Sequence, residues 1–299
     1  MNKKWSIDYA TSNDGTKIRF GLFSDQSIHN KKLSIVFCNG RSEWIEKYKQ
    51  LPLDLNIANS ALFLTLDHRG QGGSAGFPFH IDSYETYVQD LKNVIELAFS
   101  DTTQSINYGV LAHSMGGLIA LFATLQGYIK PQFLILCSPL LELPDDPFGH
   151  RINCLLAQFL TTIGLGKTRT GAAKALHFED NLLTQSKARF EELIASPHQS
   201  KRPTFAWVYA TYKAIEIIQS PKYLAQLNMP ILVLGGTEEK LLNYSSFKNW
   251  AEKANKHAKA KIVYKDIASG RHELLFEKEN IYQATLAEIE KFMTPILLP

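Results

Sequence analysis

Short, almost continuously apolar runs recur along the chain and predict its architecture. Strands buried on both faces lack the alternation of half-buried strands, and they usually belong to parallel sheets. The runs are also shorter than typical helices. We therefore predict mostly parallel strands at residues 33–38, 61–66, 107–111, 133–137 and 231–234, with a further strand near 261–264.

Segments with the period of an amphipathic helix lie between these runs. In residues 84–99, for example, Tyr84, Val88 and Leu91 fall on one apolar stripe. Alternating strands and helices indicate right-handed βαβ crossovers, so we predict a doubly wound α/β sheet. The other helices predicted for this sheet are residues 44–58, 115–125, 245–255 and 281–292.

The N-terminal residues follow a different pattern. Two alternating runs, 5–9 and 17–23, are joined by the sequence N-D-G at residues 13–15. Asn, Asp and Gly tolerate the positive φ that tight hairpin turns require. We predict an antiparallel hairpin at one edge of the sheet.

The alternation of strands and helices stops from about residue 140 to residue 225. Apolar helical stretches occupy 152–163 and 205–218 instead, and the alternation resumes at residue 231. The sequence therefore predicts an α/β core formed by residues 1–139 and 226–299, with a helical insertion at 140–225.

The composition argues against some classes of protein. The chain has 299 residues, 45% of them hydrophobic and 20% charged, which is typical of globular proteins. A net charge of +3, from 32 basic and 29 acidic residues, does not favour nucleic-acid binding. Cys38, Cys137 and Cys154 form no even set, and two of them end apolar runs. This favours a reducing compartment over a disulfide framework.

The sequence indicates neither a signal peptide nor a membrane-spanning segment. Lys3 and Lys4 precede a polar stretch rather than an apolar core. No apolar run approaches ~18 residues. We expect a cytoplasmic protein whose membrane contact is limited to peripheral association with the inner membrane.

The strongest chemical signal is a serine between a strand and a helix. The apolar run ending at Leu111 leads into A-H-S-M-G-G at residues 112–117, and a helical segment follows. A serine on such a sharp turn exposes its hydroxyl above the sheet, and the usual motif is G-x-S-x-G. Ala112 replaces the first glycine. We predict that Ser114 is a nucleophile; the alternative is a helix start with Ser114 as its N-cap.

A serine nucleophile needs a general base, and the base needs a carboxylate to orient it. With a serine on such a turn, the acid and then the histidine follow along the chain, each in a loop beyond a strand. His272, in a loop of small residues before the final helix, is the predicted base. The predicted acid is Glu239, with Glu238 as its competitor and Glu142 or Asp145 as further alternatives.

The tetrahedral intermediate of acyl transfer requires amide donors for its oxyanion. We expect one donor from Met115, directly after the serine, and the other from Arg41, in the loop after the run 33–38. Gly40 permits the sharp turn there. Gly40 and His113 are also expected to line the substrate pocket. Whether the Arg41 side chain meets a phosphate is left open.

These segments resemble the lysophospholipase and monoacylglycerol lipase branch of the α/β hydrolases, most closely its bacterial lysophospholipases. The resemblance implies an α/β-hydrolase fold in which residues 140–225 form a helical cap over the pocket. The segments that carry it are N-G-R at 39–41, D-H-R-G-Q-G-G-S at 67–74, A-H-S-M-G-G at 112–117, E-E at 238–239 and H-E at 272–273.

The resemblance also implies a serine esterase of lipid metabolism with Ser114, Glu239 and His272 as its catalytic triad. The expected substrate is a carboxylic ester of a single-chain lipid, such as a lysophospholipid or a monoacylglycerol. Such a reaction requires neither a cofactor nor a metal. Basic residues near the apolar helices of the cap suit an anionic interface, so peripheral membrane contact is expected through the cap.

Other functions are compatible with the same residues. A short-chain carboxylesterase or an aminopeptidase-like hydrolase would use the same triad. A non-catalytic binding module on the same fold is a more distant alternative. The ordered serine, acid and histidine argue against this last class.

Overall fold

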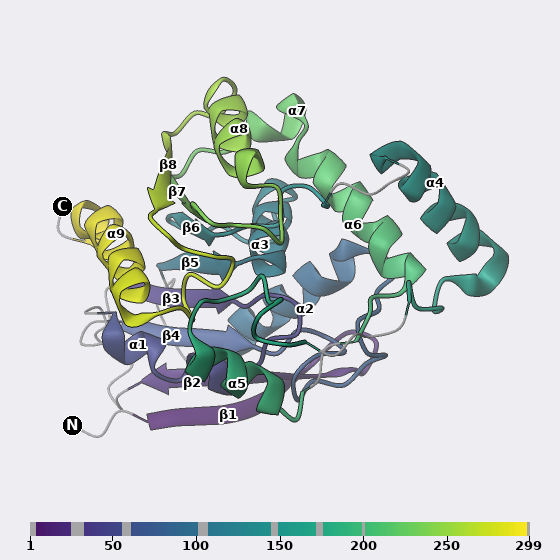
Figure 1. Cartoon of the computed structure of the whole chain (residues 1–299), viewed down its shortest axis with the longest axis horizontal. Coiled ribbons are helices and arrows are strands. Elements are labelled where there is room, and N and C mark those ends of the chain that lie inside the picture. The colour runs from purple at the N-terminus through teal and green to yellow at the C-terminus, as the bar shows by residue number, and fades with distance from the viewer. Residues whose placement is uncertain are drawn as a thin grey trace.

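The computed structural model describes residues 4–24, 33–55, 61–100, 107–144, 149–171, 176–198 and 201–297. Eight strands form one sheet in the order β1-β2-β4-β3-β5-β6-β7-β8 (Figure 1). The strands are β1 (Lys4–Thr11), β2 (Lys17–Ser24), β3 (Leu33–Cys38), β4 (Ala61–Leu66), β5 (Tyr108–His113), β6 (Leu134–Cys137), β7 (Ile231–Gly236) and β8 (Ile262–Ile267).

The sheet is parallel from β4 to β8 and antiparallel at its N-terminal edge. β1 pairs with β2 and β2 with β4 in antiparallel register, whereas every other neighbouring pair is parallel. Every residue of β6 and β7 is buried, which explains their unbroken apolar sequences. The predicted mostly parallel sheet and its antiparallel hairpin are confirmed.

Helices cover both faces of this sheet, as Figure 1 shows. Successive residues of β3 point to opposite faces, so Val36 joins one hydrophobic cluster while Ile35 and Phe37 join the other. The first cluster includes side chains of α2 (Tyr84–Ala98), α3 (Met115–Leu125) and α8 (Tyr244–Asn255), and the second includes those of α9 (Glu279–Leu297). The predicted doubly wound arrangement is therefore confirmed.

The continuous helix predicted at residues 44–58 is wrong. A 3₁₀ turn, η2 (Ile45–Tyr48), is followed by the short helix α1 (Leu51–Asp54), which has Pro52 in its first turn. Proline lacks the amide hydrogen that a helix interior needs, so a helix starts at this point instead of continuing through it. Residues 56–58 lie outside the described part of the chain.

Helices also account for the regular structure described between residues 140 and 225. They are α4 (His150–Leu160), the π-helical turn η4 (Thr161–Leu165), α5 (Lys187–Ala195), α6 (Phe205–Ile218) and α7 (Pro221–Leu224). In Figure 1, α6 lies between α4 and the core. The division into a core and an insertion with these boundaries stays a prediction. None of the described helices combines the length and apolarity that crossing a bilayer requires.

Candidate active site

The candidate catalytic residues come from loops at one edge of the sheet. Parallel strands present their carboxyl ends at the same edge, where α/β proteins bind their ligands. Ser114 follows β5, Glu239 follows β7, His272 follows β8, and Arg41 follows β3. Positions separated by up to 231 residues in sequence, from Arg41 to His272, therefore lie in neighbouring loops.

Ser114 occupies a strained turn between β5 and α3. Its backbone has φ 50° and ψ −118°, outside the helical and extended regions. The turn packs closely on the end of β3, since a Cβ added to Gly116 would lie 2.1 Å from the Cys38 carbonyl oxygen. Ala112 is fully buried in β5 beside Cys38. Its methyl group is accommodated where the usual motif has glycine.

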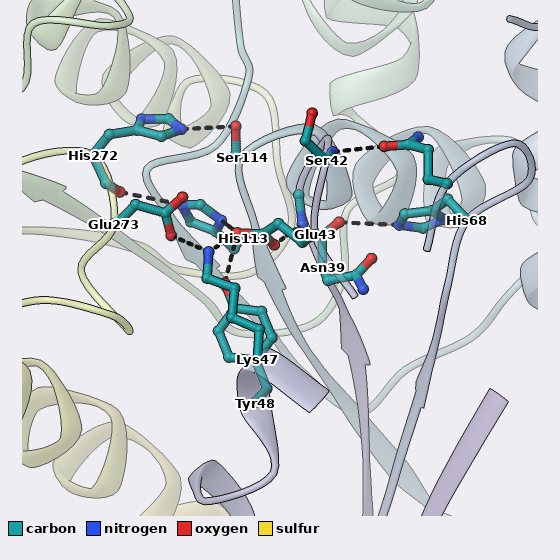
Figure 2. Close-up of polar contacts among 12 residues, drawn as sticks. Asn39, Ser42, Glu43, Lys47, Tyr48, His68, His113, Ser114, His272 and Glu273 are labelled. Atoms are coloured by element: carbon teal, nitrogen blue, oxygen red, sulfur yellow. Dashed lines mark hydrogen bonds and ion pairs between the residues drawn. The ribbon is translucent and has the colours of Figure 1, made fainter. Parts of the chain in front are cut away.

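His272 lies between the hydroxyl of Ser114 and the carboxylate of Glu239. Its Nε2 is 2.9 Å from Ser114 Oγ (Figure 2). Its Nδ1 is 2.8 Å from Glu239 Oε2. A carboxylate can only accept, so Nδ1 carries the proton and Nε2 is left to accept from the serine hydroxyl. This is the tautomer that a general base for Ser114 requires.

Glu239 is the described carboxylate that hydrogen-bonds to His272. Its Oε1 accepts from the backbone amides of Leu241 at 2.8 Å and Leu242 at 3.0 Å, which hold the side chain in place. Burial by itself would raise the pKa of Glu239, but His272 and these amides lower it below its usual value. Glu238 instead accepts from Gln185, 3.4 Å away. Asp145, another predicted alternative, lies outside the described residues.

The backbone amides of Arg41 and Met115 differ from those of neighbouring residues in their hydrogen bonding. The Gly40 amide donates to the Glu43 carboxylate, and the Ser42 amide donates to Gln71 Oε1 at 2.7 Å. Neither the Arg41 amide nor the Met115 amide donates a backbone hydrogen bond to another described residue outside the regular helices and strands. These are the two donors that the sequence predicted for an oxyanion. The sequence analysis did not identify the contribution of Gln71.

The Arg41 side chain connects this loop with the helical insertion. Its guanidinium lies 5.9 Å from the centre of the Trp207 ring in α6, and its Nη1 is 3.5 Å from the Lys201 carbonyl. The side chain is exposed. A charged group therefore lies beside the candidate site.

Gly40 and His113 are both buried and pack closely against one another. A Cβ added to Gly40 would lie 3.0 Å from both His113 Nδ1 and Glu43 Oε2, so the absence of a side chain permits this close packing. His113 is 1% exposed. Its Nε2 is 3.1 Å from the His272 carbonyl oxygen. The substrate contacts expected of Gly40 and His113 stay predictions.

A buried charge cluster, formed by Glu43, Lys47, His113 and Glu273, lies directly beneath the site (Figure 2). Lys47 Nζ hydrogen-bonds to Glu43 Oε1 and lies 2.6 Å from Glu273 Oε2. The Tyr48 hydroxyl donates to the same Glu43 oxygen at 2.7 Å. The sequence analysis missed this cluster. The spacing of Glu43 and Lys47 by four residues and the position of Glu273 beside His272 are signals that could have indicated it.

Within the described residues, three side chains that could bind a metal ion come together in this cluster. Ligand atoms of Glu43, His113 and Glu273 lie within 4.8 Å of one another. However, the Lys47 ammonium already forms ion pairs with both carboxylates. We interpret the group as an internal ion-pair network, because the cation that the carboxylates require is part of the chain.

Comparison with known proteins gives the same fold and branch. The probable lysophospholipase L2 of Haemophilus influenzae is 29% identical over 276 residues, covering 87% of this chain and 83% of that protein. A monoglyceride lipase homolog of monkeypox virus is 25% identical over 264 residues, covering 88% and 89%. A carboxyl esterase from Bacillus coagulans superposes with a TM-score of 0.82 at 16% identity, covering 98% of this chain and 99% of that one.

The family described as "Serine aminopeptidase, S33" matches residues 29–279, which is most of the chain. The resemblance to α/β hydrolases stated from the sequence motifs is thereby confirmed, as is the predicted α/β-hydrolase fold. The chain belongs to the serine aminopeptidase S33 family of α/β hydrolases.

Proposed function

We propose that this protein is a serine hydrolase that cleaves the carboxylic ester of a single-chain lipid, a lysophospholipid or a monoacylglycerol. The observation that carries the proposal is the continuous chain of hydrogen bonds from Ser114 through His272 to Glu239. A nucleophile, a base and an orienting carboxylate in this geometry are the parts that acyl transfer requires.

The reaction proceeds through an acyl-enzyme. Ser114 Oγ attacks the ester carbonyl while His272 Nε2 takes the hydroxyl proton, and the Arg41 and Met115 amides stabilise the oxyanion. When the intermediate collapses, the bond to the leaving alcohol breaks and His272 returns the proton to that alcohol. A water molecule, deprotonated by His272, then attacks the acyl-serine carbonyl. The bond to Ser114 Oγ breaks, His272 returns the proton to that oxygen, and the carboxylic acid is released. Glu239 orients the imidazole and stabilises its charged form without taking the proton.

Two features support a lipid substrate. The relatives that cover most of the chain are named as a lysophospholipase and a monoglyceride lipase homolog. The Arg41 guanidinium beside Trp207 adds a positive charge next to the candidate site that suits the phosphate of a lysophospholipid. The family description also includes aminopeptidases, so peptide-bond cleavage by the same triad is the second candidate.

The nucleophile assignment is tested by Ser114→Ala. We expect loss of esterase turnover and loss of covalent labelling by a fluorophosphonate, because the attacking oxygen is removed. Ser138→Ala is a matched control, since Ser138 is buried at the end of the neighbouring strand β6 and also has a positive φ, 43°. Labelling of Ser114→Ala at the wild-type rate would contradict the assignment.

The acid assignment is tested by comparing Glu239→Gln with Glu238→Gln. We expect Glu239→Gln to lower kcat by roughly 10²–10⁴, because an amide no longer holds the proton on Nδ1 of His272. Glu238→Gln changes a neighbour that contacts Gln185 instead, so its kcat is expected to stay within about twofold of wild type. Equal losses in the two variants would argue against Glu239 as the triad acid.

The substrate class is tested by a profile of kcat/KM across lysophospholipids, monoacylglycerols, short-chain esters and aminoacyl amides. A lipid-directed pocket gains about fourfold per added methylene until the pocket is full, since each buried methylene is worth about 0.8 kcal/mol. A maximum at the shortest acyl chains would favour a short-chain carboxylesterase. Faster cleavage of aminoacyl amides would favour an aminopeptidase, and no turnover at all would favour a binding module.

Helix α4 supports contact with a lipid surface. Among its described residues Ala157 alone is buried, whereas Leu155 is 63% and Phe159 59% exposed. In Figure 1 this helix lies at the outer margin of the molecule, beyond α6. An amphipathic helix with its apolar face uncovered can insert that face into the headgroup region of a membrane. We propose that the protein associates peripherally with membranes through α4.

The membrane contact is tested by sedimentation with vesicles of phosphatidylcholine and phosphatidylglycerol. The double variant Leu155→Glu/Phe159→Glu is expected to lower the bound fraction at least tenfold, because burying each side chain contributes about 1.5–3 kcal/mol. Leu53→Glu, at a position 50% exposed on α1, is the matched control. If the double variant and wild type sediment equally, α4 is not the contact surface.

A further inference from the structure

The two ring nitrogens of His113 both face hydrogen-bond acceptors. Nε2 lies 3.1 Å from the backbone carbonyl oxygen of His272, and Nδ1 lies 3.1 Å from Glu43 Oε1. A carbonyl oxygen cannot donate, so Nε2 must carry a hydrogen for this bond to form. The protonation state of His113 therefore depends on whether Glu43 donates or accepts.

Glu43 is surrounded by groups that donate. The Gly40 amide donates to Oε2, while the Lys47 ammonium and the Tyr48 hydroxyl both donate to Oε1. An ionised carboxylate accepts this many bonds, whereas a protonated one would have a hydrogen facing another donor. Glu43 is thus ionised, and Nδ1 of His113 must carry a hydrogen as well. With both nitrogens protonated, His113 is an imidazolium.

The charge balance of the buried charge cluster also favours a protonated His113. Glu43, Lys47, His113 and Glu273 are each at most 5% exposed. With a neutral His113 the two carboxylates and one ammonium would leave a net negative charge inside the protein. Burying an uncompensated charge costs several kcal/mol. A charged His113 makes the cluster neutral.

Among the described groups around His113, those that favour the charged ring outweigh Lys47, which repels it. Burial alone would lower its pKa, but Glu43 and Glu273 together raise the pKa of His113 above its usual value despite the repulsion from Lys47. The facing residue of β6, Cys137, is buried, and burial raises the pKa of its thiol, so it stays neutral. The ring centres of His113 and His272 lie 5.0 Å apart. The atom of His272 that hydrogen-bonds to His113 is its backbone carbonyl oxygen.

We propose that His113 is a buried imidazolium at neutral pH and that it positions the His272 loop against the turn that carries Ser114. His113 precedes Ser114 in the chain, bonds directly to the backbone of His272, and bonds through Glu43 to the Gly40 amide (Figure 2). It joins the loops that carry the candidate nucleophile, base and oxyanion donor. His113 does not touch the reacting atoms, so it is a positioning residue.

The positioning role rests on the proposed function, because it treats His272 as the base of the reaction. The charge state of His113 does not rest on it. The charge is fixed by the partners of His113, whichever substrate the site accepts. The two parts therefore need separate measurements.

The charge state is tested by nitrogen NMR of the histidine rings in the unmodified, ¹⁵N-labelled chain, assigned through the backbone. We expect both His113 nitrogens to show imidazolium shifts and attached protons at pH 7.5, about a unit above the ordinary histidine pKa of 6.5. His68 is an internal control, because burial lowers its pKa to about 4 and it should show one bare nitrogen. One bare nitrogen on His113 at this pH would overturn the proposal.

The positioning role is tested by His113→Gln, which retains one donor but neither the charge nor the second bond. We expect kcat to fall at least tenfold with KM within about twofold, because the substrate still binds while the base is misplaced. A fall confined to KM, or no fall, would refute the positioning role. If Ser114→Ala also retains turnover, the proposed function itself fails.

The same variant gives a pH signature that packing alone would not produce. A raised pKa in the folded state stabilises the protein fully below the unfolded pKa, about 6.5, and this contribution is lost as pH rises through the folded value. The stability difference between wild type and His113→Gln should therefore shrink as pH rises above 6.5. For His68→Gln the sign is opposite, because His68 stays neutral in the folded protein near pH 6.5 while the unfolded chain still takes up protons there. Its difference should grow slightly around pH 6.5 and then stay constant. A constant difference for His113→Gln would contradict a charged His113.

Discussion

Parallel pairing from β4 to β8 is the constraint on which the candidate site depends. It brings the carboxyl ends of these strands to one edge, so each strand delivers its following loop to the same region. Hydrogen bonds of 2.8 and 2.9 Å between Ser114, His272 and Glu239 require loops placed within a few tenths of an ångström. The buried central strands provide this rigidity, because close-packed interiors have low compressibility and resist displacement.

Strand geometry alone does not fix how the loops lie against one another. The buried charge cluster supplies contacts between them, since Lys47 links Glu43 in the loop after β3 with Glu273 in the loop after β8. Such a cluster contributes little net stability, because desolvation of each charge offsets much of the attraction. The cluster instead fixes the relative positions of the loops, because its interactions are directional. Ion pairs and hydrogen bonds with acceptor-only partners favour one arrangement of the loops, whereas apolar packing would tolerate several.

The sheet and the order of the candidate residues could be predicted from sequence because both depend on local patterns. An unbroken apolar run identifies a buried strand, and the residues around Ser114 identify its turn without knowledge of distant contacts. The choice between Glu239 and Glu238 could not be made with the same certainty, since adjacent residues point in different directions and the loop decides which one meets His272. The polar partners of His113 could not be predicted from the sequence, because they are distant along the chain. Its partners Glu43 and His272 lie 70 and 159 residues away.

The helical insertion shows a further limit of pattern analysis. An apolar stripe at helical spacing predicts α4, but it does not say what covers that stripe. In the core, the corresponding stripe of α2 buries Tyr84, Val88 and Leu91 against the sheet. In α4 the stripe remains largely exposed, although the apolar residues are spaced in the same way. The difference arises because α6 already occupies the position next to the core, so α4 packs on another helix. An apolar face left uncovered in this way is costly in water, and this exposed face is the observation on which the proposed membrane contact rests.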